Sequence, residues 1–167
     1  MFSRNAFLLA SAAVALGGCT ALYAATAGAS LNSQDKSFVD EAAKAGMSEV
    51  HMGKLGMEKA SAPDVRAFSQ RMINDHTKAN DELTGIATRK GLSMPGDHNM
   101  PGMLNVKSGA SFDHAFAKQA VEDHEKAVAL FEKEAAEGSD PDLKAFARRT
   151  LPTLRSHLAA ARALPQQ

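Results

Sequence analysis

The chain has 167 residues, of which 19 are basic and 19 acidic, so its formal net charge at neutral pH is zero. It has no Trp, one Tyr and no stripe of Lys and Arg, so it lacks the basic, aromatic surface of nucleic-acid-binding proteins. We therefore expect no nucleic acid among its partners. The single Cys excludes an internal disulfide, and the length fits one domain once a leader is removed.

Residues 1–18 have the pattern of a secretory signal peptide. A short segment containing Arg4 precedes an apolar run over residues 6–16, which is shorter than a membrane-spanning helix. The run ends in Leu16-Gly-Gly-Cys19, which resembles a bacterial lipobox. We expect cleavage to leave Cys19 as the lipid-bearing N-terminus, with residues 19–32 as a flexible tether to the periplasmic face of the outer membrane. The alternative is cleavage after Ala27 or Ala29, which would release a soluble periplasmic protein.

A repeated stretch indicates how the rest of the chain is organised. Residues 61–72 and 139–150 share Ser, Pro, Asp, Ala, Phe and Arg at a constant offset of 78 residues. Each copy is typical of a helix start, with a Ser before a Pro in the first turn and an Asp at capping-box spacing. The offset extends backwards, since it also relates Phe38 to Phe116. We infer two similar helical hairpins.

Apolar periodicity predicts four helices, over about residues 34–60, 63–90, 111–137 and 141–164. Asn32 or Ser33 is the expected cap of the first helix, and Pro152 is expected to kink the last helix or disrupt one of its turns. Short links within each pair predict antiparallel hairpins, whereas residues 91–110 are rich in Gly and Pro and long enough to cross the bundle. The predicted fold over residues 33–167 is all-α: a ferritin-like four-helix bundle made of two hairpins joined by a long crossover loop.

Each predicted helix carries one ionisable residue on its apolar stripe. These residues are Glu49, His76, His124 and His157. Counted from the two hairpin turns, they fall within about 9 Å of one level. Three imidazoles and a carboxylate at one level would suit a transition metal such as Zn, Cu, Fe or Mn. The alternative is a buried polar layer that sets the register of the helices without a metal.

Charged residues beside these histidines, and elsewhere on the helices, have two interpretations. Asp75, Glu122, Asp123 and Glu125 flank the histidines and are candidates for hydrogen bonds that orient metal ligands. Such residues are also typical of a solvated helix face. The charged outer faces of residues 132–134 and 144–149 are interpreted as solvated helix surface.

The stretches that carry these features resemble a known family. Residues 38–53, 65–76, 112–113, 121–124 and 151–157 are similar to the ferritin-like family called domain of unknown function 4142, described as predicted outer-membrane or periplasmic proteins. The similarity extends from about Ser33 to Leu164. It implies that the family's characteristic Glu and His positions fall on Glu49, His76, His124 and His157, and it brings no established activity.

The ligand pattern departs from that of di-iron ferritin-like enzymes, which place a Glu-x-x-His motif on each of two helices. The residue three before His76 is Ile73, and the residue three before His157 is Leu154. No nucleophile elbow or phosphate-binding loop occurs either. We therefore favour a non-catalytic protein, with a divergent metalloenzyme as a lesser alternative. The main alternative to metal binding is a structural or interaction module of the envelope, whose protein partner is unknown and which is compatible with a homo-oligomer.

A second set of soft donors lies in the crossover loop. It comprises Met94, His98, Met100 and Met103. Thioethers combined with an imidazole suit Cu(I), so this loop is a secondary candidate for copper binding. The alternative is a turn-rich loop in which these side chains have no role.

Overall fold

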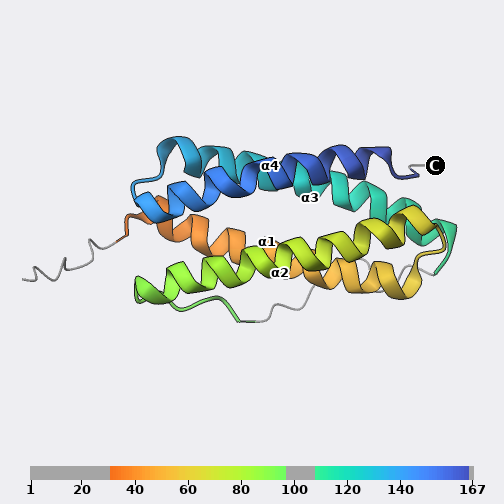
Figure 1. Ribbon diagram of the computed structural model, residues 1–167, viewed down its shortest axis with the longest axis horizontal. Helices are drawn as coiled ribbons and strands as arrows, with labels where there is room; N and C mark the ends of the chain where they lie inside the picture. The colour runs from red at the N-terminus through yellow and green to blue at the C-terminus, as the bar shows by residue number, and fades with distance from the viewer. Residues whose placement is uncertain (1–30, 97–107, 166–167) are drawn as a thin grey trace, which may run out of the picture.

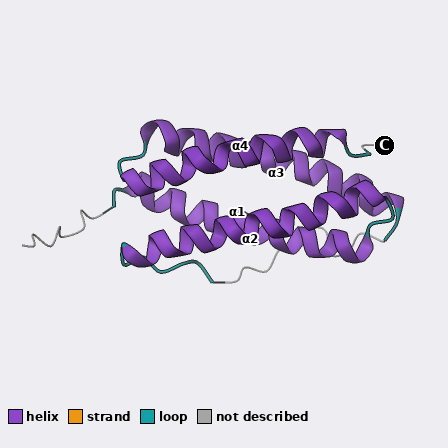
Figure 2. Cartoon of the chain, in the orientation of Figure 1, coloured by secondary structure: helices purple, strands orange, loops and turns teal. Residues whose placement is uncertain are grey.

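The computed structural model describes residues 31–96 and 108–165. This part of the chain forms four helices and contains no strand (Figures 1 and 2). The helices are α1 (Ser33–Lys59), α2 (Pro63–Arg89), α3 (Ala110–Glu137) and α4 (Pro141–Ala163). Every boundary lies within one residue of its predicted position, and the all-α bundle is confirmed. None of these helices is long and apolar enough to cross a membrane. The signal peptide and Cys19 lie outside the described residues.

The two hairpins are joined by the long connection that the sequence predicts. The backbone N–H of Gly109 donates a hydrogen bond to the carbonyl oxygen of Lys59, so α3 begins where α1 ends. Helix α2 ends at the other end of the bundle (Figure 1). The chain therefore travels the length of the bundle between α2 and α3. Gly91 and Gly109 flank this connection with φ values of +68° and +94°, a region that favours glycine.

Two buried aspartates connect the hairpins. Each lies on one hairpin and accepts hydrogen bonds from the turn of the opposite hairpin. Asp113, in the first turn of α3, accepts hydrogen bonds from the backbone N–H of Ser61, from that of the residue after it, and from the Ser61 hydroxyl. Asp35, in the first turn of α1, accepts backbone hydrogen bonds from Ser139 and from the residue after it, at 2.9 and 3.1 Å. The two contacts obey the 78-residue repeat and lie at opposite ends of the bundle. We call them the Asp113 latch and the Asp35 latch.

These latches give the serines of the repeat a role other than capping. The capping-box spacing would suit Ser61 and Ser139 as caps of the helices that follow them. The N-cap of α2 is instead Ala62, without a side-chain hydrogen bond, and the N-cap of α4 is Asp140, whose carboxylate accepts two backbone hydrogen bonds. The serines contact carboxylates from the opposite hairpin, and these long-range contacts leave no trace in local spacing.

The start of α1 confirms Asn32 as its cap and includes Leu31 in the bundle, and α4 remains helical in its middle. Leu31, which we assigned to the tether, is 8% exposed and packs in the core, and Asn32 caps α1 by accepting the N–H of Asp35 at 2.7 Å. Helix α4 continues through Pro152, whose side chain is exposed, so the proline does not interrupt the helix.

One charged residue that we assigned to the solvated surface is buried. Glu134 is 1% exposed, although Glu132 and Lys133 beside it are exposed as expected. Glu134 belongs to the inner face of α3 because it lies three residues after Phe131, which packs in the core. We had assigned Glu134 to the surface because it is charged, although its spacing fits the inner face of the helix.

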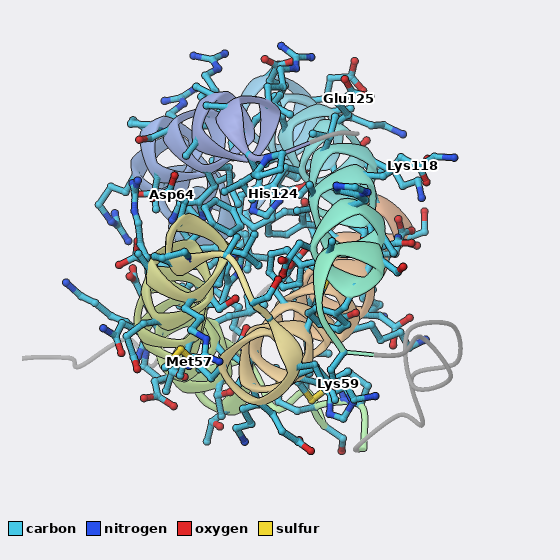
Figure 3. All side chains as sticks on the ribbon, turned by 90° about the vertical axis from the view of Figure 1, so that its right-hand side faces the viewer. Met57, Lys59, Asp64, Lys118, His124 and Glu125 are labelled. Carbon is cyan, nitrogen blue, oxygen red and sulfur yellow. The ribbon has the colours of Figure 1, made fainter. Side chains whose placement is uncertain are left out.

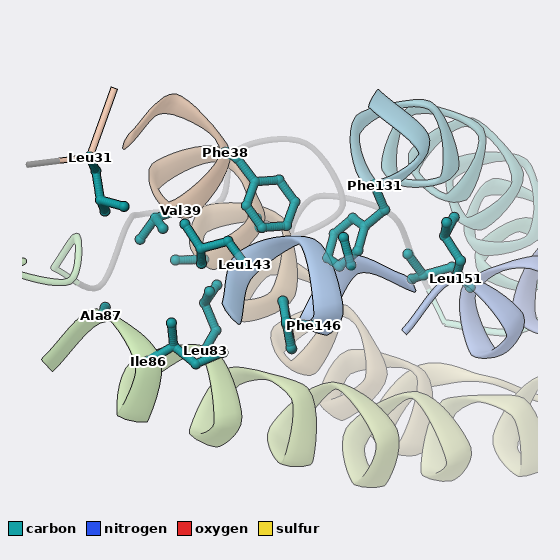
Figure 4. Packing of buried hydrophobic residues seen from close by; sticks show 14 residues of the cluster. Leu31, Phe38, Val39, Leu83, Ile86, Ala87, Phe131, Leu143, Phe146 and Leu151 are labelled. Atoms are coloured by element: carbon teal, nitrogen blue, oxygen red, sulfur yellow. The ribbon is translucent and has the colours of Figure 1, made fainter. Parts of the chain in front are cut away.

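The core consists of two apolar clusters, one toward each end of the bundle. The first cluster, shown in Figure 4, is built around Phe38, Phe131 and Phe146. The second is built around Phe68 and Phe116. Along every helix, the candidate site residue lies between the segment that enters one cluster and the segment that enters the other. The bundle thus holds a polar layer between two hydrophobic clusters.

Candidate metal centre

Three of the four predicted site residues meet in this polar layer. His76 from α2, His124 from α3 and His157 from α4 are 7%, 1% and 0% exposed. Their ring centroids are 5.6, 5.3 and 5.4 Å apart, which makes a nearly equilateral triangle. One ring nitrogen from each lies within 4.8 Å of those from the other two. Viewed along the bundle, His124 lies in the interior between the helices (Figure 3).

Hydrogen bonds orient two of the rings and set their tautomers. His124 Nδ1 lies 2.7 Å from the carbonyl oxygen of Ala120, and His157 Nε2 lies 2.8 Å from Oδ2 of Asp75. A carbonyl oxygen and a carboxylate can only accept, so each of these nitrogens carries the proton. The opposite nitrogen of each ring therefore has a free lone pair. The flanking carboxylate that contacts a histidine directly is Asp75, one of the four that the sequence indicated.

One nitrogen of each ring is buried without a partner. Nε2 of His76, Nε2 of His124 and Nδ1 of His157 have no hydrogen-bond partner. Buried polar atoms are normally satisfied, and each unsatisfied one costs about 1–3 kcal/mol. Three such atoms on adjacent rings are an unusual arrangement for a protein that uses histidine only for packing. A cation bound by the three lone pairs would satisfy all of them.

The rings are in the protonation state that a metal requires. Burial lowers the pKa of His76 to about 3, and the neighbouring rings add to the effect. Burial likewise lowers the pKa of His124 to about 4, against the hydrogen bond to Ala120, and lowers that of His157, against the hydrogen bond to Asp75. The three imidazoles are therefore neutral at physiological pH. Neutral imidazole is the form that binds metals, so no proton competes for the site.

The comparison with known families follows from this fold and these residues. Residues 20–164 match the model of the family described as Domain of unknown function (DUF4142). The chain belongs to this family. No curated protein sequence matches the chain. The DUF4142 match covers all four helices and all four predicted site residues.

Solved structures share the fold of this DUF4142 protein at low sequence identity. A DUF305 fragment from Deinococcus radiodurans has a TM-score of 0.70 at 15% identity, over 81% of this chain and 97% of the fragment. CopM in the Cu(I)-bound form has a TM-score of 0.66 at 15% identity, over 77% of this chain and 93% of CopM. CopM in an Ag-bound form has a TM-score of 0.65 over the same shares. At this identity the likeness shows the fold alone.

Glu49, the fourth predicted residue, lies beside the histidine group and is not a member of it. It is 4% exposed, and its Oε1 is 3.9 Å from Nδ1 of His124, the nitrogen that is bonded to Ala120. Its other oxygen has no hydrogen-bond partner. Burial raises the pKa of Glu49 to about 8, and the negative charge of Asp123 adds to the effect. The carboxyl group is therefore largely protonated at neutral pH.

The sequence did not predict some contacts of the site, and some predicted donors lie outside the described residues. The hydrogen-bond acceptor of His124 is the backbone carbonyl of Ala120, which cannot be recognised from the type of residue. Its position four residues before His124 is that of a neighbour on the same helix face. Phe68 packs edge-on against His124 and His157. Met94 of the candidate copper loop is partly buried against the first core cluster. The other loop donors, His98, Met100 and Met103, lie outside the described residues.

Proposed function

We propose that this protein is a metal-binding helical bundle of the bacterial cell envelope, which holds one transition-metal ion at His76, His124 and His157. The observation that carries the proposal is the set of three unpartnered, buried ring nitrogens, one from each histidine. A cation bound to these three nitrogens would account for their lack of other partners.

The donor set favours copper or zinc over the other metals that the sequence left open. Imidazole suits Zn, Cu, Fe and Ni, whereas Mn prefers carboxylate and water oxygens. Among divalent ions, Cu²⁺ binds most tightly to a given nitrogen site. Glu49 is a candidate for a further ligand, because one of its oxygens is unpartnered and a bound cation would favour its ionised form. The CopM structures, which carry Cu and Ag, support the suitability of this bundle architecture for such ions.

The envelope location rests on the N-terminal sequence. We propose export through residues 1–18 and lipid attachment at Cys19, which would tether the bundle to the outer membrane. A soluble periplasmic form is the alternative. In either case a binding role without catalysis fits the site better than a di-iron enzyme, since the converging group consists of three imidazoles and no bridging carboxylate.

Metal titration of the purified protein, after chelator treatment and its removal, tests the proposal. We expect one equivalent of Cu²⁺ or Zn²⁺ per chain by elemental analysis and calorimetry, with weaker binding of Fe²⁺ and Mn²⁺. Alanine at His76, His124 or His157 should abolish this binding. The matched control is His51→Ala, which removes an exposed histidine of α1 and should leave the stoichiometry unchanged.

The Asp75→Asn substitution tests whether Asp75 orients the His157 ring without binding the metal itself. It should keep the stoichiometry but weaken the affinity by roughly 10–100-fold, as expected when the partner of a metal-bound histidine is weakened.

The alternatives predict different results. If the histidines form only a structural polar layer, the wild-type protein binds no metal. Each histidine substitution then destabilises the fold irrespective of added metal. If copper remains bound in the three alanine variants but is lost on replacing Met94, His98, Met100 and Met103, the site lies in the crossover loop. Turnover of peroxide or oxygen by the metal-loaded protein would instead indicate an enzyme.

A further inference from the structure

A cavity of about 280 Å³ between α2 and α4 reaches the histidine group from one side. His76 and His157 form part of its wall, whereas His124 does not line it. Asp75, Thr150 and Thr153 also line the cavity and contribute a carboxylate and two hydroxyl groups. The cavity therefore connects the protein surface with two of the three candidate ligands through a passage that contains oxygen donors.

An ion pair between the two helices lies at the edge of this cavity. Glu82 of α2 and Arg149 of α4 both line it, and Arg149 Nη2 donates to Glu82 Oε1 at 2.5 Å. Their side chains are 41% and 59% exposed, so this pair is on the solvent side, whereas the histidines are buried. Exposed ion pairs contribute little to stability, so this one can break and re-form readily.

His76 is the least restrained ring of the group. It is the most exposed of the three, at 7%, and its Nε2 has no hydrogen-bond partner. His124 is held by the Ala120 carbonyl and His157 by Asp75. A rotation of His76 leaves both of those hydrogen bonds in place, and His76 is a wall of the cavity as well as a member of the group.

We propose that the cavity between α2 and α4 is the route by which the metal ion enters and leaves, with His76 as the first ring to bind it and the Glu82–Arg149 pair as its gate. This inference rests on the proposed function of the histidine group. A hydrated cation loses water on entry, and the oxygens of Asp75, Thr150 and Thr153 replace part of its hydration shell. The positive charge of Arg149 repels an entering cation. Its ion pair with Glu82 also keeps that carboxylate from binding the cation.

Two substitutions that spare the ligands should change the rate of metal uptake in opposite directions. Arg149→Ala removes one of the two cations that line the cavity, the other being Lys78, and frees Glu82. We therefore expect Cu²⁺ to bind several-fold faster, with a gain that shrinks at high salt. Thr153→Phe fills the cavity, so we expect uptake and release both to slow several-fold. Stopped-flow absorbance of the Cu²⁺–imidazole complex measures the rates, and calorimetry should show little change in equilibrium affinity.

The control for the filled cavity is Ala159→Phe, which adds the same ring on the exposed side of α4 and should leave the rates unchanged. If Thr153→Phe does not fold, Ala79→Leu fills the same cavity from α2. Wild-type rates in the filled variant would overturn the route, and slower uptake in Arg149→Ala would overturn the gate. Failure of the wild-type protein to bind Cu²⁺ is a separate result, which overturns the proposed function itself.

Discussion

Glu134 is a buried carboxyl group without a cationic partner. Neither of its oxygens has a hydrogen bond of good geometry, although Asp35 and Gln34 lie nearby. Burial raises its pKa to about 7, and the negative charges of Asp35 and Asp140 add to the effect. The residue at the equivalent position of the first hairpin is Gly56, so this buried carboxyl group belongs to one half of the molecule only.

Replacing this carboxyl group should stabilise the protein at high pH. The folded pKa of Glu134 lies above its ordinary value of 4.5, so the folded state holds the proton more tightly, and stability falls as pH rises from about 4.5 through about 7. Glu134→Gln stays neutral and avoids this loss. We expect it to be more stable than the wild type by about 3 kcal/mol at pH 8, with little difference at pH 4. Urea unfolding across this range measures the effect.

Glu122→Gln, on the exposed side of the same helix, is the control and should show no such pH-dependent gain. A difference between Glu134→Gln and the wild type that stays constant from pH 4 to pH 8 would contradict the assignment of a raised pKa.

At the scale of the elements, α1 and α2 approach each other closely through glycines on α1. A Cβ atom added at Gly53 would lie 2.9 Å from the backbone carbonyl oxygen of Ser69 and 2.8 Å from Cγ1 of Ile73. A backbone atom cannot move aside as a flexible side chain can, so glycine is required there.

Two alanine substitutions should therefore have opposite effects on stability. Alanine is normally better than glycine inside a helix by about 0.5–1 kcal/mol. Gly85→Ala should show this gain, because its added Cβ would meet only Nη1 of Arg89, at 3.6 Å. Gly53→Ala should lose about 1–3 kcal/mol, since the clash forces α1 and α2 apart. Thermal unfolding of both variants tests this, and a stabilised Gly53→Ala would show that the helices separate at little cost.

At the scale of the whole molecule, the two latches hold the hairpins in register at both ends of the bundle. Asp113 and Asp35 are 3% and 1% exposed, and each accepts backbone N–H groups that a helix would otherwise leave without a partner. The latches follow the 78-residue repeat, so they give the bundle an approximate two-fold symmetry. The histidine group between them breaks that symmetry, because Gly46, Ala79 and Leu154 occupy the equivalent positions.

Loss of one latch should weaken the bundle, and loss of both should weaken it additively. Asp113→Asn and Asp35→Asn remove charge-assisted hydrogen bonds, and we expect each to lower the free energy of unfolding by about 1–3 kcal/mol. The effects should add in the double variant because the sites lie at opposite ends of the molecule. Asp81→Asn, on an exposed part of α2, is the control. Denaturant unfolding measures all four proteins, and a double variant no weaker than either single one would contradict two independent latches.

The sequence by itself determined the four helices, their pairing into hairpins and the common level of the three histidines. Helix boundaries depend on local signals such as apolar period, Pro and Gly, and the rise per residue is constant, so heights can be counted along the chain. This counting placed His76, His124 and His157 correctly before any tertiary contact was known.

Only the tertiary structure decided how side chains at that level are arranged. The rotation of each helix about its axis brings the three histidines together and leaves Glu49 beside them, and it buries Glu134 while Glu132 stays exposed. The serines of the hairpin turns bind Asp113 and Asp35, which are 52 and 104 residues away from them. Such contacts depend on the packing of helices from distant parts of the chain, and local periodicity carries no information about that packing.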